Sequence, residues 1–422
     1  MIYEEFSRIL KSEMVPALGC TDPIGIAFCA AVARKYSRGD IIKIEAWLSK
    51  NLIKNVMAVI IPGSNGMCGA GIAAALGAVC GDPDKKLEVL EGISSEQVNE
   101  AAVLEDAGKI TIYVADENIP LYMKLRLFTE QDEVTVIIKD GYTNVTEISV
   151  NGCCILKESE SGAADDSLRY DLLDLGNIMD FADNAPLDSM GVVAEAIEMN
   201  RDLAQAGLNE GLGTRIGMLI KESGREKVHS DITSNAMLWA SAGVDARMAG
   251  CQLPAMSNTG SGNQGIVSTM PVFGASKALG KSDEEMIRAA ALSCLITIYI
   301  KHRIGKLTSV CGCTIAGTGS ACGIVYLQGG NKQDMVNVMK NMFGNVAGMI
   351  CDGAKISCAL KTATCINAAC MSAELALQGF GLDVTNGITG DSEKQCIDNF
   401  VRTSKEGLEK MDEVVLDIIM NK

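Results

Sequence analysis

Thiols are the chemical groups that this sequence supplies most generously, with 16 cysteines against only two histidines. Cys351 and Cys358 flank an acidic, glycine-containing turn in "MICDGAKISCALK", and Cys311 and Cys313 stand about forty residues upstream in "SVCGC". Neither spacing is the CxxC pair of zinc ribbons and thioredoxins. Because histidine is so scarce, nucleophile–histidine catalysis and histidine-based zinc sites are also hard to build.

Iron–sulfur ligation suits these thiols better than zinc does. A cluster is held by thiolates, and turns add backbone N–H groups that hydrogen-bond its sulfides. Cys351 and Cys358 offer two thiols across one turn, and "SVCGC" offers a third, either Cys311 or Cys313. Three protein ligands on a four-iron cluster leave one iron open. An open iron acts as a Lewis acid rather than as an electron carrier.

Composition limits the partners of the protein. The net charge of −16 would repel nucleic acid and anionic membranes. The first twenty residues have no apolar core segment of a signal peptide, and the apolar stretch 66–81 is too short to span a bilayer. We therefore expect a cytoplasmic protein that binds neither nucleic acid nor a membrane, and whose thiols stay reduced.

The elements that must position these thiols fall into two unlike parts. The first part has helical patterns at 2–14 and 23–37 and alternating, strand-like patterns, at 41–49, 109–115, 121–129, 133–140 and 145–152. The acidic segment "KESESGAADDSLRYD" reads as a linker, and long helical patterns follow it, at 190–208, 282–305 and 406–420.

The predicted fold class is therefore α+β. We expect a mixed domain over residues 1–160, with antiparallel strands, Cys20 and a glycine-rich turn. A larger all-helical domain over residues 161–422 should carry the cluster thiols.

Two polar segments are expected to contact a substrate. The turn "SNTGSGNQG" combines backbone donors with polar side chains that suit an α-carboxylate, namely Ser257, Asn258, Thr259, Ser261, Asn263 and Gln264. Lys54 and Asn55 form a second candidate wall, with Lys54 as a cation for the carboxylate. The plainer alternatives are an ordinary loop between helices and a solvated lysine at the end of a strand.

Four separated segments resemble the L-cysteine desulfidase family, which is related to the α-domain of iron–sulfur L-serine dehydratases. They are "EMVPALGCTDPIGIAFCAA", "KNVMAVIIPGSNGMCGAGIAAALGA", "IGKLTSVCGCTIAGTGSACG" and "GMICDGAKISCALK". The resemblance runs from about Glu4 to Ala376. It implies a [4Fe-4S] enzyme that converts L-cysteine to pyruvate, ammonia and hydrogen sulfide without pyridoxal phosphate.

The same resemblance implies roles for individual residues. The cluster ligands would be Cys311, Cys351 and Cys358, and Cys20, in "ALGCT", would be the proton acceptor. The serine dehydratase motif favours Cys313 in place of Cys311; we prefer Cys311 and leave the choice open. The extra C-terminal cysteine of the dehydratases has no counterpart in "DIIMNK", which favours the desulfidase branch.

Elimination requires that the α-proton be removed while the sulfur leaves. Coordination of the substrate sulfur to the open iron would stabilise the departing charge, and a soft thiolate suits iron better than a hydroxyl does. Cys20 precedes a predicted helix, where the helix dipole lowers the pKa of a thiol. We therefore expect Cys20 to take the α-proton as a thiolate.

The sequence leaves three alternatives open. They are an iron–sulfur L-serine dehydratase, a pyridoxal-phosphate lyase, and a non-enzymatic iron–sulfur or thiol redox sensor. The expected partner is a small amino-acid substrate, with a homodimer as one option for assembly.

Overall fold

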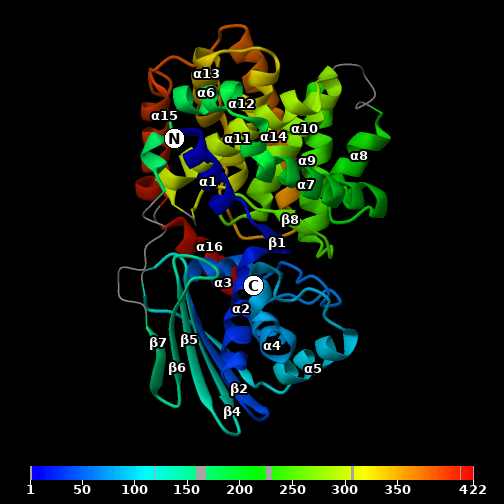
Figure 1. Ribbon diagram of the computed structural model, residues 1–422, viewed down its shortest axis with the longest axis vertical. Helices are drawn as coiled ribbons and strands as arrows, with labels where there is room; N and C mark the ends of the chain where they lie inside the picture. Colours follow the sequence, from blue (N-terminus) through cyan, green and yellow to red (C-terminus); the bar gives the residue numbers. More distant parts are fainter. Residues whose placement is uncertain are drawn as a thin grey trace.

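A six-stranded sheet with helices packed on it and a larger helical assembly make up the chain (Figure 1), and the predicted α+β class is confirmed. The computed structural model describes residues 2–117, 119–157, 168–224, 231–305, 308–408 and 410–421. Within these ranges, no helix is both long and apolar enough to cross a membrane.

The sheet has the strand order β3-β2-β4-β5-β6-β7, in which β2 and β3 are parallel and all other neighbours are antiparallel. Its strands are β2 (Ile41–Leu48), β3 (Ile110–Val114), β4 (Tyr122–Thr129), β5 (Glu133–Lys139), β6 (Val145–Val150) and β7 (Cys153–Lys157). The alternating patterns predicted the first five. β7, where Cys153 and Cys154 are exposed, was not predicted from the sequence.

Helices cover the sheet and place Cys20 at one end of it. They are α2 (Thr21–Lys35), α3 (Lys50–Val56), α4 (Ala70–Cys80) and α5 (Ser95–Asp106). Small residues let α2 and α4 pack closely, since a Cβ on Gly77 would lie 2.1 Å from the carbonyl oxygen of Ala27. Lys54 and Asn55 lie in α3, a helix that the sequence analysis did not predict.

The helical assembly surrounds its own apolar core. Its helices are α1 (Ile2–Glu13), α6 (Leu175–Asn184), α7 (Gly191–Glu210), α8 (Ile216–Glu222), α9 (Ile232–Met248), α10 (Gly262–Leu279), α11 (Asp283–Ile304), α12 (Gly312–Leu327), α13 (Lys332–Val346), α14 (Cys358–Leu377) and α15 (Glu393–Arg402). The last helix, α16 (Met411–Met420), packs on α3 instead. One short strand departs from the all-helical expectation: β8 (Pro254–Met256) pairs with β1 (Pro16–Leu18).

The first and last helices of the described chain each pack in the core that is formed mainly by the other part of the sequence. Phe6, Ile9 and Leu10 of α1 are buried in the helical core, whereas Leu416 of α16 joins the core under the sheet. In Figure 1, α16 accordingly lies beside α3, between the sheet and the helices. The predicted division at residue 160 falls in 158–167, outside the described residues, and stays a prediction.

Candidate active site

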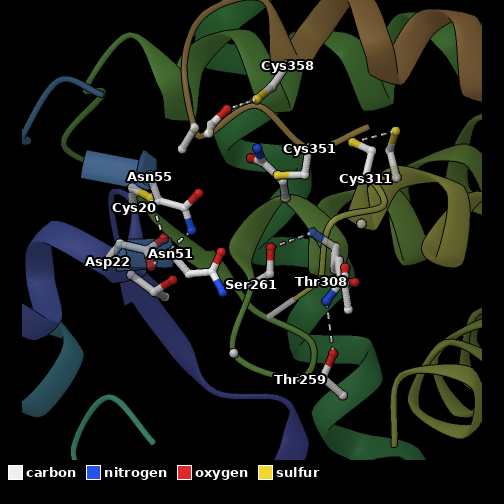
Figure 2. A pocket seen from close by; sticks show the side chains of 18 of the residues that line it. Cys20, Asp22, Asn51, Asn55, Thr259, Ser261, Thr308, Cys311, Cys351 and Cys358 are labelled. Atoms are coloured by element: carbon white, nitrogen blue, oxygen red, sulfur yellow. Dashed lines mark hydrogen bonds between the residues drawn. The ribbon is translucent and has the colours of Figure 1, made fainter. Parts of the chain in front are cut away.

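A cavity of about 120 Å³ is lined by residues from both parts of the chain. Figure 2 shows Cys20 and Asp22 on one side of it, Cys351 and Cys358 opposite, and Thr259 and Ser261 below. The cavity brings together most of the predicted site residues, namely Cys20, Lys54, Asn55, Thr259, Ser261, Asn263, Gln264, Cys311, Cys351 and Cys358.

Two predicted residues have other tasks. The hydroxyl of Ser257 donates to the carbonyl oxygen of Val15 at 2.6 Å, and the amide of Asn258 donates to the carbonyl oxygen of Cys294 at 3.3 Å. Neither side chain is among those that line the cavity. Ser257 and Asn258 instead fasten the glycine-rich turn to its neighbours, so that Thr259, Ser261, Asn263 and Gln264 face the cavity.

Backbone pairing and helix ends place the three predicted ligands. The N–H of Cys311 donates to Met349 O at 2.7 Å, and the N–H of Cys351 donates to Ser309 O at 2.8 Å. This short antiparallel contact brings two distant segments together. Cys311 is the N-cap of α12, and Cys358 is the first residue of α14, so both thiols lie at the positive ends of helices.

Cys313 also reaches the cavity, beside Cys311. The two sulfur atoms lie 3.2 Å apart. Cys313 is the more buried of the two, and its thiol lies 3.3 Å from Met349 Sδ and 3.8 Å from Lys361 O. Cys311 is therefore the more exposed residue of the pair.

These thiols lie where a bare thiolate is unfavourable. Burial raises the pKa of Cys351, and it raises the pKa of Cys358 to about 12. The thiol of Cys313 and then burial raise the pKa of Cys311. Three such thiols facing one cavity would therefore ionise readily only beside a strong cation.

That donor set fits an iron–sulfur cluster better than a single metal ion. In the part of the chain that the structure describes, no three His, Cys, Asp or Glu side chains are placed to hold one ion. In a cluster each thiolate binds a different iron, so the ligands surround a larger body. Cys311, Cys351 and Cys358 supply three such thiolates around a shared cavity.

Basic side chains lie near the predicted ligand thiols. Lys301 lines the cavity, and burial lowers the pKa of its ammonium to about 8. Lys361 pairs with Asp352 and donates to Ile350 O at 3.0 Å, which braces the turn after Cys351. The carboxylate of Asp352 pairs with the ammonium groups of both Lys361 and Lys355.

Cys20 occupies the predicted helix terminus, but its expected acidity is wrong. It is the N-cap of α2, yet burial and then the charge of Asp22 raise its pKa to about 12. Desolvation outweighs the helix dipole here because the thiol is almost fully enclosed. Cys20 is therefore a protonated thiol at neutral pH.

Asp22 is the partner of that thiol, and the sequence analysis did not single it out. The Cys20 thiol donates to Asp22 Oδ2 at 3.6 Å. Asp22 Oδ1 accepts hydrogen bonds from the Tyr142 hydroxyl at 3.0 Å and from the Asn55 amide at 3.3 Å. Burial raises the pKa of Asp22 despite these bonds. The residue pattern C-x-D at a helix start was the available signal.

Lys54 is buried and already paired. Its ammonium lies 2.6 Å from Asp412 Oδ1 of α16, and Asp412 Oδ2 accepts from the Ser309 hydroxyl at 3.0 Å. The ammonium of Lys54 thus ties α3 to α16 beside the thiol-bearing segment. It lines the cavity with its positive charge balanced.

Two further basic residues after Lys301 point elsewhere. His302 stacks on the ring of Tyr170 with centroids 4.2 Å apart, and Arg303 pairs with Asp398. Arg247 of α9, by contrast, lines the cavity and was missed entirely. It stands in "GVDARMAG", where nothing local marks it except a charge among small and apolar residues.

Comparison with known proteins gives first a class and then a family. The family model described as "Serine dehydratase alpha chain" matches residues 84–417. Such proteins are lyase-type enzymes that typically depend on an iron–sulfur cluster. This chain belongs to the serine dehydratase alpha chain family.

Several relatives of similar length are similar to this sequence over nearly its whole length. The UPF0597 protein of Oleidesulfovibrio alaskensis is 39% identical over 430 residues, which cover 100% of both chains. The UPF0597 protein of Clostridium perfringens and the UPF0597 protein BF3560 of Bacteroides fragilis are each 38% identical over 421 residues, covering 99% of this chain and 98% of the relative. These names state no activity.

Proposed function

We propose that this protein is an iron–sulfur L-cysteine desulfidase, which converts L-cysteine to pyruvate, ammonia and hydrogen sulfide. The observation that carries the proposal is the meeting of Cys20, Cys311, Cys351 and Cys358 in one cavity beside a polar turn. Membership of a lyase family supports elimination chemistry at that cavity.

Three of the four thiols would hold a [4Fe-4S] cluster. We assign this role to Cys311, Cys351 and Cys358, and we prefer Cys311 to Cys313 because Cys311 is the more exposed residue of the pair. When bound, a cluster with three protein ligands supplies a Lewis-acidic iron for the leaving sulfur. The reaction in this proposal requires no pyridoxal phosphate.

The protein's own residues would move the proton. Cys20 Sγ takes the α-proton while its thiol proton passes to Asp22 Oδ2. The electrons of the Cα–H bond form the Cα–Cβ double bond, and sulfur leaves as hydrosulfide with the electron pair of the Cβ–S bond. The resulting 2-aminoacrylate tautomerises and hydrolyses to pyruvate and ammonia.

Asp22 suits this part of the relay for a physical reason. Burial raises its pKa, so the carboxylate is a stronger base than one in water. Tyr142 and Asn55 hold Oδ1 and leave Oδ2 for the thiol. A neutral Cys20 beside a charged Asp22 would therefore act as a pair that carries one negative charge.

Sulfur chemistry favours cysteine over serine as the substrate. A soft thiolate binds iron more strongly than an alcohol does, which would assist departure of the sulfur. An iron–sulfur L-serine dehydratase is the second candidate, because the matching family carries that name. A redox sensor would need no polar cavity beside its thiols, so the cavity and the family weigh against it.

Parallel assays of two substrates test the proposal. Protein purified and reconstituted without oxygen is given L-cysteine or L-serine, and pyruvate, ammonia and sulfide are measured. We expect one sulfide per pyruvate from L-cysteine and a specific activity at least about tenfold lower with L-serine. Pyruvate from L-serine at the higher rate would instead establish the dehydratase.

A further inference from the structure

Arg247 is a buried cation whose hydrogen-bonding capacity is only partly used. It lies on α9, is 3% exposed and lines the cavity. Its Nη1 donates to Asn263 Oδ1 at 2.9 Å, whereas Nε and Nη2 are buried without a hydrogen-bond partner. A guanidinium is always charged in proteins, so two unmet donors on a buried one are costly.

The charge of Arg247 is also not neutralised by an ion pair. Among the ion pairs of the described residues, no carboxylate lies within 4.0 Å of its nitrogens. Its charge does act on Cys20 and Asp22, lowering the pKa of each against the effect of burial. Arg247 therefore belongs to the side of the cavity where the α-proton would be removed.

The two free donors have the geometry that a carboxylate requires. Nε and Nη2 are the parallel pair on one edge of the guanidinium, and such a pair binds both oxygens of a carboxylate. The turn at the start of α10 fixes this orientation. Asn263 holds Nη1, and Gly262 packs so closely that a Cβ there would lie 2.3 Å from Nε.

Unused acceptors lie on the same cavity. Asn55 Oδ1 and Gln264 Oε1 are buried without partners. Their orientation is fixed because each amide group donates to an acceptor elsewhere: Asn55 to Asp22, and Gln264 to Asn258 O at 3.2 Å. Both residues line the cavity, and an unpaired amide oxygen there suits an ammonium group, which has donors only.

Lys54 is poorly placed to anchor a carboxylate, because its ammonium is already 2.6 Å from Asp412. We propose instead that Arg247 binds the α-carboxylate of a free amino acid, while the amide oxygens of Asn55 and Gln264 receive its α-ammonium. This inference rests on the proposed function, because it identifies how that substrate is held. It predicts that the cavity binds amino-acid zwitterions more tightly than molecules with only one of the two charged groups, whatever the β-substituent.

Binding of molecules that cannot be eliminated tests this directly. L-alanine carries both groups, ethylamine lacks the carboxylate, and propionate lacks the ammonium. Calorimetric titration of the anaerobic holoenzyme should show L-alanine binding more tightly than either. In Arg247→Met, the affinity for L-alanine should fall on the order of 100-fold, to the affinity for ethylamine. The affinity for ethylamine should not change, because ethylamine has no carboxylate.

Two controls separate binding from folding and from the cluster. Arg201→Met removes a partly exposed arginine of α7, which pairs with Asp202, and should change no affinity. Arg247→Lys keeps the positive charge but lacks the parallel pair of donors. If Arg247→Met fails to fold, Arg247→Lys takes its place, and it should bind L-alanine with only part of the wild-type affinity. Iron content should equal that of the wild type in each variant.

Several results would overturn the inference. They are a wild type that binds ethylamine or propionate as tightly as L-alanine, an Arg247→Met variant that keeps full L-alanine affinity, or a folded Arg247→Met variant that has lost its iron. Failure of the proposed function is distinguishable. If the wild type eliminates nothing from L-cysteine but Arg247→Met still loses L-alanine binding, the carboxylate site is supported and only the proposed reaction fails.

Discussion

The environment of a residue decides its chemistry here more than its position along a helix does. Cys20 stands at a helix N-terminus, which alone would favour a thiolate. Enclosure by the protein and the neighbouring charge of Asp22 reverse that preference. The catalytic unit that we propose is the Cys20–Asp22 pair, beside the hydroxyl of Tyr142 and the guanidinium of Arg247.

Replacing Asp22 with asparagine tests that pair. Loss of the carboxylate should lower sulfide release by about 100-fold or more, because the thiol proton has no acceptor. It should also remove a negative charge that raises the pKa of Cys20. Alkylation of Cys20 in the iron-free protein, followed by mass spectrometry, should therefore begin at lower pH in Asp22→Asn than in the wild type.

Asp245→Asn is the matched control, because Asp245 is also a buried carboxylate whose pKa burial raises, and it lies outside the cavity lining. It caps the segment before α8 and should alter stability without moving the alkylation profile of Cys20. An Asp22→Asn profile that matched the wild type would contradict the relay.

The site residues that could be predicted from the sequence are those whose residue type and spacing are distinctive. The thiols at 311, 351 and 358 and the turn at 257–265 are recognisable in the sequence alone, and the cavity gathers these segments. Asp22 had a local signal in its spacing from Cys20, whereas Tyr142 and Arg247 escaped because their neighbours come from distant elements. No local pattern says that a guanidinium in α9 will face the start of α2.

At the scale of elements, the C-terminal helix braces the cavity from outside. α16 packs on α3, and Asp412 joins the buried ammonium of Lys54 to the hydroxyl of Ser309. Ser309 precedes Cys311 and accepts the N–H of Cys351 on its carbonyl. One carboxylate therefore connects α3 with both segments that bear the proposed cluster ligands.

Asp412→Asn should loosen this brace. The buried Lys54 ammonium would lose its counter-charge, which costs about 3 kcal/mol in comparable ion pairs. We expect a lower denaturant midpoint for the iron-free protein and faster loss of iron from the holoenzyme. Glu413→Gln removes the neighbouring exposed pair with Lys50 and should change little. Equal midpoints for the two variants would contradict the brace.

The predictability of elements followed the strength of their patterns. Period-two alternation identified the strands from 41 to 150, and it matches burial most clearly in β4 and β5, where every second residue is buried. The short helix α3 was missed because seven residues hold too few turns to show a period. β7 was missed because its residues are exposed, so burial imposes no alternation on them.

At the scale of the whole molecule, the cavity depends on two cores meeting. Cys20 is the N-cap of α2, which packs in the core under the sheet, while the proposed cluster ligands belong to the helical assembly. Three contacts hold these parts together: β1 pairs with β8, α1 packs in the helical core, and α16 packs in the core under the sheet. The sequence predicted the two kinds of structure, but it could not show that the ends of the chain cross between them.

The most direct test of the central claim is to count iron and sulfide release together. Wild type, Cys351→Ala and Cys153→Ser are purified without oxygen and reconstituted, and bound iron, acid-labile sulfide and turnover of L-cysteine are measured in each. We predict that Cys351→Ala loses cluster and turnover together, and that Cys153→Ser, which alters an exposed thiol of β7, keeps both. Sulfide release by Cys351→Ala at the wild-type rate would contradict the account.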